Sequence, residues 1–317
     1  MPLNLHHLRI FAAIVEHGGF TRAARVLRLS QPAVSKSLNE LERQLHVTLL
    51  DRTGKTATLT EAGRTLYARA GELFGVERAA ERELRELRGL KRGVLRVAAS
   101  TTIATYLLPR YLGRFQTRHP GVRIRTTSTN TRAVLRALLE FRVDVALVEG
   151  PVEHARVLVV PWRDDELVVI AAPDHPIATA GALEAGQLAD EQFLVREPGS
   201  GTRVVTERAL AGRGVRLERT IRVGGTEAIK QAVAAGLGLG IVSRAAAADQ
   251  LALGRIVVVP VRDLVIRRTL AQIKLRDRPT TIAGRELESL LMASDVLEGS
   301  EASADATGSA ESSSNHG

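Results

Sequence analysis

The first part of the chain repeats a hydrophobic spacing that is typical of short amphipathic helices. Apolar residues three, four and seven positions apart occur in residues 8–15 and again in residues 20–27, with a pair of glycines between the two runs. A third apolar run, in residues 34–45, follows a short turn. Ser30 is placed to cap this third helix, and Pro32 is tolerated in its first turn. The spacing therefore predicts three short helices with a tight turn between the second and the third, as in a helix-turn-helix.

The polar face of the third predicted helix carries side chains that suit DNA. Gln31 and Asn39 can pair with the edge of adenine, and Lys36 can bind guanine or a phosphate. Ser35 lies on the same face, and the set occupies the N-terminal half of the helix, which enters the major groove in this motif. A solvated polar face is the competing interpretation. The position directly after the turn favours DNA binding.

Residues 49–60 predict two short extended pieces joined by a turn. Such a wing would bring Arg52 and Lys55 near the DNA backbone or the minor groove, although an ordinary basic hairpin turn would have the same residues. Residues 1–62 contain eight basic and five acidic residues, so a single copy should bind DNA weakly. This argues for more than one copy on each DNA site.

Thr60 can cap a long helix that is expected to continue to about Leu90. Its apolar residues follow a heptad seam, which Glu77 interrupts, and its other faces are charged. A helix of about 30 residues would be roughly 45 Å long and has no core of its own. It must therefore pack on its own domain or on a second subunit. The glycines of residues 89–93 end the helix and provide a hinge.

The second half of the chain alternates between strand-like and helix-like patterns. Strands are expected at residues 94–99, 122–126, 143–148, 167–172, 192–196, 219–223, 240–243, 256–260 and 269–275, and helices at residues 132–139, 203–210 and 228–234. This alternation predicts α/β layers that are rich in parallel strands. About 200 residues can form either one large α/β unit or two small ones.

Four of the turns in this half are rich in small hydroxyl and amide residues. Their candidate binding residues are Ser100, Thr101, Thr102, Asn130, Thr131, Ser200, Gly201, Thr202, Arg203 and Thr226. Each turn could be no more than a helix cap. Because ligands bind beyond the carboxyl ends of the strands in open α/β sheets, the four turns together favour one cleft. Free N–H groups at helix N-termini and the fork of Arg203 suit a small anion.

Composition and charge narrow the possible functions. The net charge is +9, while the last 24 residues hold five acidic and no basic residues, so the rest of the chain is still more basic. A basic body fits nucleic acid or an anionic ligand, although an arginine-rich, GC-biased genome gives the same excess. The chain has no cysteine, which excludes a disulfide scaffold, a thiolate metal site and a cysteine nucleophile. We expect the tail, residues 294–317, to be disordered.

No segment predicts a membrane span or an export signal. The longest uncharged stretches, such as residues 231–243, have 13 residues, against about 20 for a spanning helix. The N-terminal apolar run is too short for the core of a signal peptide. We therefore expect a cytoplasmic protein with no membrane partner.

Several blocks of sequence in residues 5–63 agree in order and spacing with one known family. They occur at residues 20–24, 30–35, 41–42 and 59–63, and they resemble the winged helix-turn-helix of LysR-type transcriptional regulators. The resemblance implies DNA contact by Gln31, Pro32, Ser35 and the following basic residue, here Lys36 where arginine is common. The complete set of candidate DNA-binding residues is Thr21, Arg22, Gln31, Pro32, Ser35, Lys36, Asn39, Arg52 and Lys55.

The resemblance also implies an architecture. The fold class is α/β with an N-terminal all-α winged helix-turn-helix, a long linker helix and a two-lobe, periplasmic-binding-protein-like effector domain. The expected domains are residues 1–60, 61–90, 91–293 and the acidic tail 294–317. One lobe would take residues 93–163 and 267–293, and the other residues 164–266. Paired linker helices would give a homodimer, assembled further into a homotetramer.

The function implied is a sequence-specific regulator that binds double-stranded DNA and is gated by a small anionic metabolite. Residues 146–150 and 196–203 resemble most the branch of the family that acts in sulfur or carbon assimilation. No cofactor and no metal are expected. A sequence-independent architectural DNA-binding protein is the alternative, but it leaves the two-lobe region without a role.

A solute-binding protein and an enzyme fit less well. The solute-binding protein fails on the missing export signal and on the DNA-reading head. An enzyme with a serine nucleophile at Ser200 would need the motif Gly-x-Ser-x-Gly. Pro198 replaces the first glycine of this motif, so the nucleophile elbow is absent. The glycines of residues 236–240 come between a helix and a strand, the reverse of the dinucleotide-binding order. None of the histidines forms a metal-binding pair. We therefore expect no catalysis.

Overall fold

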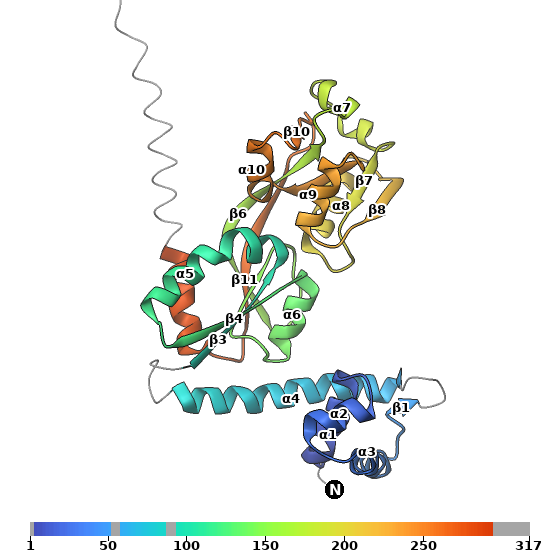
Figure 1. The fold of residues 1–317 in the computed structure, drawn as a ribbon, viewed down its shortest axis with the longest axis vertical. Coiled ribbons are helices and arrows are strands. Elements are labelled where there is room, and N and C mark those ends of the chain that lie inside the picture. Colours follow the sequence, from blue (N-terminus) through green and yellow to red (C-terminus); the bar gives the residue numbers. More distant parts are fainter. Residues whose placement is uncertain (1–2, 52–57, 87–92, 294–317) are drawn as a thin grey trace, which may run out of the picture. The chain divides into compact units, whose positions relative to one another are not determined.

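The computed structural model describes residues 3–51, 58–86 and 93–293 (Figure 1). The chain forms two compact units, Met1–Leu84 and Arg85–Gly317. Among the described residues, no helix combines the length and the apolar character that crossing a membrane requires.

The N-terminal unit is a winged helix-turn-helix followed by a long helix, as the sequence predicted. Its elements are α1 (Leu5–Glu16), α2 (Phe20–Leu27), α3 (Gln31–Leu45), β1 (Leu50–Asp51), β2 (Thr58–Leu59) and α4 (Glu61–Glu86). Strands β1 and β2 pair in antiparallel fashion. The helices share one core, in which Phe11, Val34 and Leu38 are completely buried. The tip of the wing, with the candidates Arg52 and Lys55, lies outside the described residues.

Local interactions explain why these elements begin and end where they do. Ser30 caps α3, because its hydroxyl accepts a hydrogen bond of 3.3 Å from the N–H of Ala33. Thr60 caps α4 in the same way, accepting from the N–H of Gly63 at 3.0 Å. A Cβ atom on Gly63 would lie 2.0 Å from the carbonyl oxygen of Leu49. Only glycine therefore allows α4 to begin this close to the wing.

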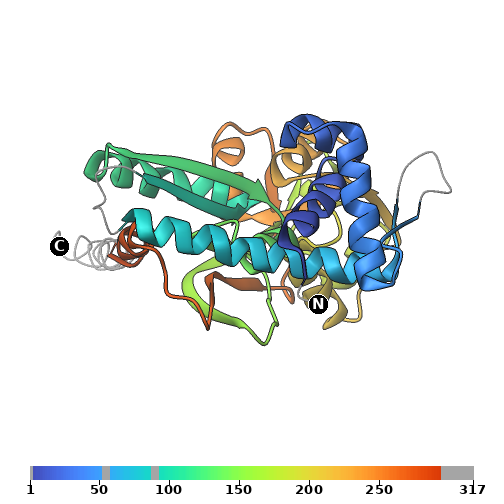
Figure 2. The ribbon, with the colours of Figure 1, turned by 90° about the horizontal axis from the view of Figure 1, so that it is seen from below.

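Helix α4 is continuous over Glu61–Glu86 (Figure 2). Ala70 lies in the core of the head, whereas Leu73 and Leu84 are 37% and 66% exposed. The predicted seam is thus only partly covered within this unit. Glu77, which interrupts the seam, forms an ion pair with Arg9 of α1. The expected end of the helix near Leu90, and the hinge after it, fall on residues 87–92, outside the described part of the chain.

The C-terminal unit alternates strands and helices. Its elements are β3 (Gly93–Ser100), a π-helix (Ile103–Leu107), α5 (Leu108–Arg118), β4 (Val122–Thr129), α6 (Thr131–Leu139), β5 (Val145–Val148), β6 (Val157–Ala171), α7 (Pro176–Thr179), a 3-10 helix (Ala185–Leu188), β7 (Gln192–Val195), α8 (Gly201–Ala211), β8 (Arg219–Arg222), α9 (Thr226–Ala234), β9 (Leu239–Ser243), α10 (Arg244–Ala252), β10 (Val257–Val259), β11 (Ile266–Leu275) and a helix at residues 282–293. Every predicted strand is present. The sequence analysis did not specify the π-helix, α5, α7, the 3-10 helix, α10 or the helix at residues 282–293.

The strands form one mixed sheet in the order β4-β3-β5-β11-β6-β9-β7-β8, with β10 paired to β6. Strands β3, β4 and β5 are parallel, as are β7, β8 and β9. The long antiparallel pair β6 and β11 runs through both groups (Figure 1). The first lobe is built around β3–β5, and the second around β7–β10.

Each lobe has its own hydrophobic core. Trp162 and Leu270 belong to the core of the first lobe, whereas Leu167 and Ile266 belong to a core of the second. Strands β6 and β11 therefore pass from one lobe to the other between these residues. The lobes are thus connected by two short stretches of backbone, one in β6 and one in β11. Such an arrangement allows hinge motion between the lobes.

Candidate functional site

The exposed face of α3 is the first candidate site. Gln31, Pro32, Lys36 and Asn39 are exposed and Ser35 is half-buried, and all five line one groove with Glu40 and Arg43. The opposite face of α3 is fixed in the core of the head by buried apolar residues. The polar set is thus held rigidly on an accessible surface.

Two further DNA-binding candidates lie on α2. Thr21 and Arg22 are exposed, and the guanidinium of Arg22 donates a hydrogen bond of 3.0 Å to the carbonyl oxygen of Gly18. Arg22 is therefore tied to the start of its own helix.

Glu42 has a positioning role that the sequence analysis missed. Its carboxylate accepts hydrogen bonds from the N–H groups of Leu49, at 2.7 Å, and Leu50, at 3.2 Å. These bonds join the C-terminal part of α3 to the first strand of the wing. The block at residues 41–42 was the signal that could have revealed this role.

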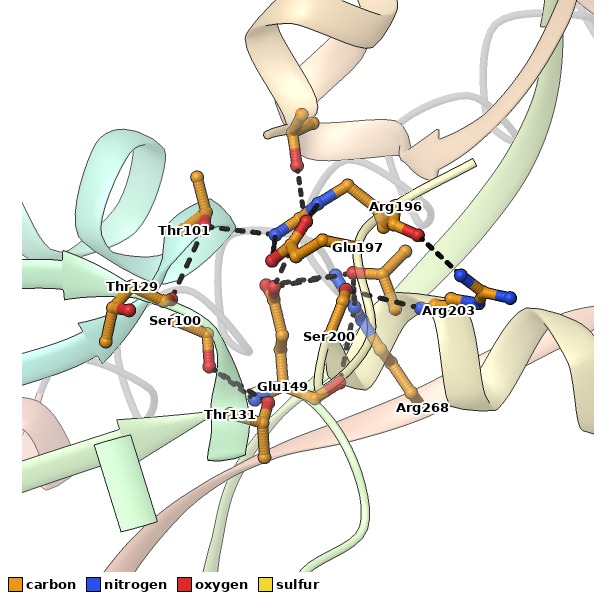
Figure 3. A network of polar contacts seen from close by, with 12 residues as sticks. Ser100, Thr101, Thr129, Thr131, Glu149, Arg196, Glu197, Ser200, Arg203 and Arg268 are labelled. Atoms are coloured by element: carbon orange, nitrogen blue, oxygen red, sulfur yellow. Dashed lines mark hydrogen bonds and ion pairs between the residues drawn. The ribbon is translucent and has the colours of Figure 1, made fainter. Parts of the chain in front are cut away.

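The second candidate site lies between the lobes of the C-terminal unit, where the predicted turns meet (Figure 3). At the end of β3, the hydroxyl of Ser100 accepts a hydrogen bond of 3.1 Å from the N–H of Glu149 and lies 3.4 Å from the hydroxyl of Thr131. Thr101 donates to the carbonyl oxygen of Thr129. The carboxyl ends of β3, β4 and β5 are thereby joined, as expected for neighbouring parallel strands.

Arg196 stands at the centre of this site, and the sequence analysis did not select it. Its guanidinium is 3% exposed and forms two hydrogen bonds, of 2.8 and 3.0 Å, with the carboxylate of Glu197. It also donates to Thr101 of the first lobe and to Thr226 of the second, each at 3.2 Å. One buried cation is therefore held by both lobes.

A second buried cation, Arg268, lies nearby on β11. It donates at 2.8 Å to Asp165 of β6 and at 2.8 Å to the hydroxyl of Thr202. It also donates to the carbonyl oxygen of Glu149, whose side chain is 1% exposed. Buried charges are costly unless they are paired. The site neutralises its two cations with Glu149, Asp165 and Glu197.

The two lobes approach each other closely at a pair of glycines. A Cβ atom on Gly201, at the start of α8, would lie 2.7 Å from the Cα atom of Gly150, which follows β5. The N–H of Arg132 donates to the carbonyl oxygen of Gly199 at 3.2 Å in the same region. Any side chain at either glycine would push the lobes apart.

Not every predicted binding residue takes part in this network in the same way. Asn130 and Ser200 cap α6 and α8, respectively. Thr102 is 1% exposed, and its hydroxyl has no hydrogen-bond partner among the described residues. Arg203 donates to the carbonyl oxygen of Arg196 and to Glu207, so its guanidinium is engaged within the second lobe.

The electrostatics of Glu197 follow from these contacts. Burial alone would raise the pKa of Glu197, but hydrogen bonds from Arg196 and from the backbone outweigh burial, and the pKa is lower than usual. Glu197 is therefore ionised at neutral pH. Its side chain is 29% exposed, so it is the most accessible member of the charged network.

A further contact spans the lobes at the π-helix. Tyr106 donates a hydrogen bond of 2.6 Å to Glu227 of α9. Lys230 lies 2.9 Å from the same carboxylate and 4.7 Å from the centroid of the Tyr106 ring. The hydrogen bond from Tyr106 is the main cause of a pKa of about 2 for Glu227. Burial opposes this shift, and smaller contributions from Lys230 and Gln231 lower the pKa further.

Comparison with known families settles what kind of protein carries these sites. Residues 5–64 match the bacterial regulatory helix-turn-helix protein of the lysR family, and residues 88–294 match the LysR substrate binding domain. The chain belongs to the LysR family. It is a DNA-binding transcriptional regulator with an effector-binding domain.

Individual relatives support this assignment over most of the chain. The RuBisCO operon transcriptional regulator of Allochromatium vinosum is 39% identical over 268 residues, which cover 84% of this chain and 88% of that protein. The transcriptional regulator YeiE of Escherichia coli (strain K12) is 40% identical, covering 88% of this chain and 93% of YeiE. The similarity to RuBisCO regulators agrees with the branch that residues 146–150 and 196–203 predicted.

A solved structure supports the fold of the C-terminal unit. The regulatory domain of CcmR from Synechocystis PCC6803, in complex with 2-PG, is 30% identical, with a TM-score of 0.59. The match covers 64% of this chain and 97% of the CcmR domain. The two-lobe arrangement predicted from the sequence is confirmed.

Proposed function

We propose that this LysR-family regulator binds specific DNA sequences and is gated by a small anionic metabolite bound between its two lobes. The observation that supports gating most strongly is the position of Arg196. Its buried guanidinium contacts Thr101 in the first lobe and Thr226 in the second. An anion bound to Arg196 therefore changes contacts that both lobes share, which gives it different affinities for different lobe arrangements.

Glu197 occupies the position that an effector anion needs. It forms the two-pronged hydrogen bond with Arg196 that a carboxylate or phosphate group prefers. Because Glu197 is partly exposed, it can turn toward solvent when a ligand arrives. We infer that the effector displaces the carboxylate of Glu197 from Arg196, because no free positive charge is left on Arg196. Thr102, whose hydroxyl has no hydrogen-bond partner in the described part of the chain, is a further candidate contact.

DNA reading is assigned to the candidates of the N-terminal unit. Gln31, Ser35, Lys36 and Asn39 would contact base edges and phosphates from the major groove. Thr21, Arg22 and Pro32 would support α3, and Arg52 and Lys55 would follow the phosphate backbone. We propose residues 1–60 as the reading head, 61–90 as the linker and 91–293 as the effector domain.

Assembly follows from the uncovered face of α4. Leu73, Val76 and Leu84 are exposed apolar residues on one long helix, and pairing with the same helix of a second subunit would cover them. A single head carries little positive charge and should bind DNA weakly. Two heads on one DNA bind more tightly and favour a site that is an inverted repeat. We propose a homodimer that assembles into a homotetramer.

The relatives suggest what the regulator responds to. Relatives named for the RuBisCO operon, together with a similar domain bound to 2-PG, favour a metabolite of carbon assimilation. We propose that the chain acts by binding alone, without catalysis. Its place of action would be the cytoplasm, where a bacterial regulator meets its DNA.

A nuclease footprint on the DNA upstream of the chain's own gene tests this function. Full-length protein is compared with Arg196→Lys, with and without a pool of small anionic metabolites and across salt concentrations. We expect an extended footprint that changes with metabolites in the wild type only. Protection that never depends on metabolites would contradict gating. Salt-sensitive coating without a discrete footprint would favour the architectural alternative.

A further inference from the structure

A cavity of about 610 Å³ lies inside the second lobe, between α8 and the strands β7 and β9. Its floor is apolar and includes Phe193, Leu210 and Ile241 of the lobe's core. Protein interiors are close-packed and leave few voids larger than a water molecule. Pockets for small ligands are typically about 300–1,000 Å³ and mostly apolar. The size and lining of this cavity are those of a ligand pocket.

The rim of the cavity adds a specific charge. Arg203 and Glu207 face each other there, and their ion pair of 2.7 Å cancels both charges. Arg216 is exposed and has no hydrogen-bond or ion-pair partner within the described part of the chain. An unpaired guanidinium above an apolar floor is suited to a carboxylate that carries an apolar body. A purely polar metabolite would leave the floor unfilled.

We propose that this cavity is a second ligand site, which takes a monocarboxylate with an aliphatic or aromatic body. The carboxylate binds Arg216 at the rim, and the apolar body packs against Phe193 and Leu210. The cavity shares Arg196 and Thr202 with the site between the lobes, but its carboxylate anchor is Arg216, so ligand binding here is tested apart from anion binding at Arg196.

The walls of the cavity connect it to the contact between the lobes. Thr202, which lines the cavity, accepts a hydrogen bond from Arg268 at 2.8 Å. Arg196 lines it from the end of β7 and reaches Thr101 of the first lobe. Helix α8 begins at Gly201, against Gly150 of the first lobe. A ligand beneath α8 therefore acts on the same contacts as the cleft, which makes it a second effector.

Isothermal titration of full-length protein with octanoate tests the site. Acetate supplies the charge without the apolar body, and octanamide supplies the body without the charge. Arg216→Ala removes the rim cation. The matched control is Arg213→Ala, an exposed arginine of the same loop that does not line the cavity. Ala211→Trp fills the mouth of the cavity with a large side chain.

We expect octanoate to bind one site per chain, and acetate not to bind. Arg216→Ala should weaken octanoate binding roughly 10-fold or more, as for loss of a charged hydrogen bond. Arg213→Ala should leave the binding unchanged, and Ala211→Trp should abolish it. Arg216→Ala alters an exposed side chain, so it keeps the test valid even where Ala211→Trp does not fold.

Three results would overturn the proposal. They are the absence of octanoate binding, octanoate binding that persists in folded Ala211→Trp, and equal effects of Arg216→Ala and Arg213→Ala. Octanamide binding as tightly as octanoate would refute the carboxylate assignment. A footprint that responds to other metabolites while octanoate fails to bind would leave the cleft in place and remove only this second site.

Discussion

Removing the charge of Glu197 should strengthen anion binding at Arg196. Glu197→Gln keeps the size and one acceptor oxygen of the side chain but removes the internal anion that an effector must displace. In the structure two hydrogen bonds, of 2.8 and 3.0 Å, hold this anion in place. Hydrogen bonds to charged groups contribute about 1.5–3 kcal/mol, and partial exposure of Glu197 favours the lower end, about 1–2 kcal/mol. At about 1.4 kcal/mol per factor of ten, the variant should bind anions about 5–30-fold more tightly.

Isothermal titration of full-length protein with sulfate, and then with anionic metabolites, measures this change. Glu140→Gln is the matched control, since it removes the same charge from a partly buried ion pair with Arg142 that lies outside the network of Figure 3. The pKa of Glu197 is lower than usual, so wild-type competition is complete at neutral pH and fades only as the pH falls through that pKa. Sulfate affinity should therefore rise toward acid in the wild type and stay flat in Glu197→Gln. Weaker sulfate binding by the variant would show that Glu197 assists the ligand, and would refute displacement.

Four other perturbations test separate parts of the molecule. Gln31→Ala should cost about 1–3 kcal/mol on cognate DNA and little on random DNA; equal losses in a gel-shift titration would contradict base readout. Gly201→Ala places a Cβ atom 2.6 Å from the hydroxyl of Thr131. Metabolite-dependent changes in the footprint should therefore disappear, while DNA binding remains. Gly186→Ala is the control, because its Cβ atom would lie in open space. Arg268→Met leaves buried carboxylates unpaired, and the free energy of unfolding in urea should fall by about 3–5 kcal/mol; an unchanged value would refute the network. The pKa of Glu227 is about 2 against an ordinary 4.5, so ionised Glu227 stabilises the fold above pH 4.5 and this stabilisation is lost as the pH falls toward 2; acid unfolding of Glu227→Gln should lack that dependence.

The reading head was predictable because its short helices each bury mainly one face. Even there the predicted face of α1 was incomplete. Ile10 and Ile14 are 2% exposed, whereas Ala12 and Val15 are only half-buried. Helix α1 packs against α2, α3 and the start of α4, so it buries more than one stripe. A spacing rule that assumes a single buried face cannot anticipate this.

The strands of the C-terminal unit were predictable for a different reason. Central strands such as β5 and β9, which are buried along their whole length, appear as continuous apolar runs. The edge strands β4 and β8 are mostly exposed and do not follow this rule. The first part of β6 was not predicted as a strand, because it contains Asp164, Asp165 and Glu166. These residues are paired with residues far along the chain. Arg196 was not predicted as a site residue for the same reason, because its partners are distant in the sequence. Its partner Thr101 lies 95 positions away, and a single sequence does not reveal which of many arginines is buried.

The site between the lobes therefore differs from a preformed anion-binding site in one essential respect. The turns that the sequence identified supply hydroxyls and helix N-termini. The two cations beside these turns, Arg196 and Arg268, are already neutralised by the chain's own carboxylates. The free energy of effector binding must come from exchanging Glu197 for the effector anion. Only the part of this free energy that differs between the two lobe arrangements can drive a switch. Glu197 is the carboxylate that can leave at least cost, because Glu149 and Asp165 are at least nine-tenths buried and Glu197 is not. The specificity of this regulator should thus depend on how well a metabolite replaces both the charge and the two-pronged geometry of Glu197.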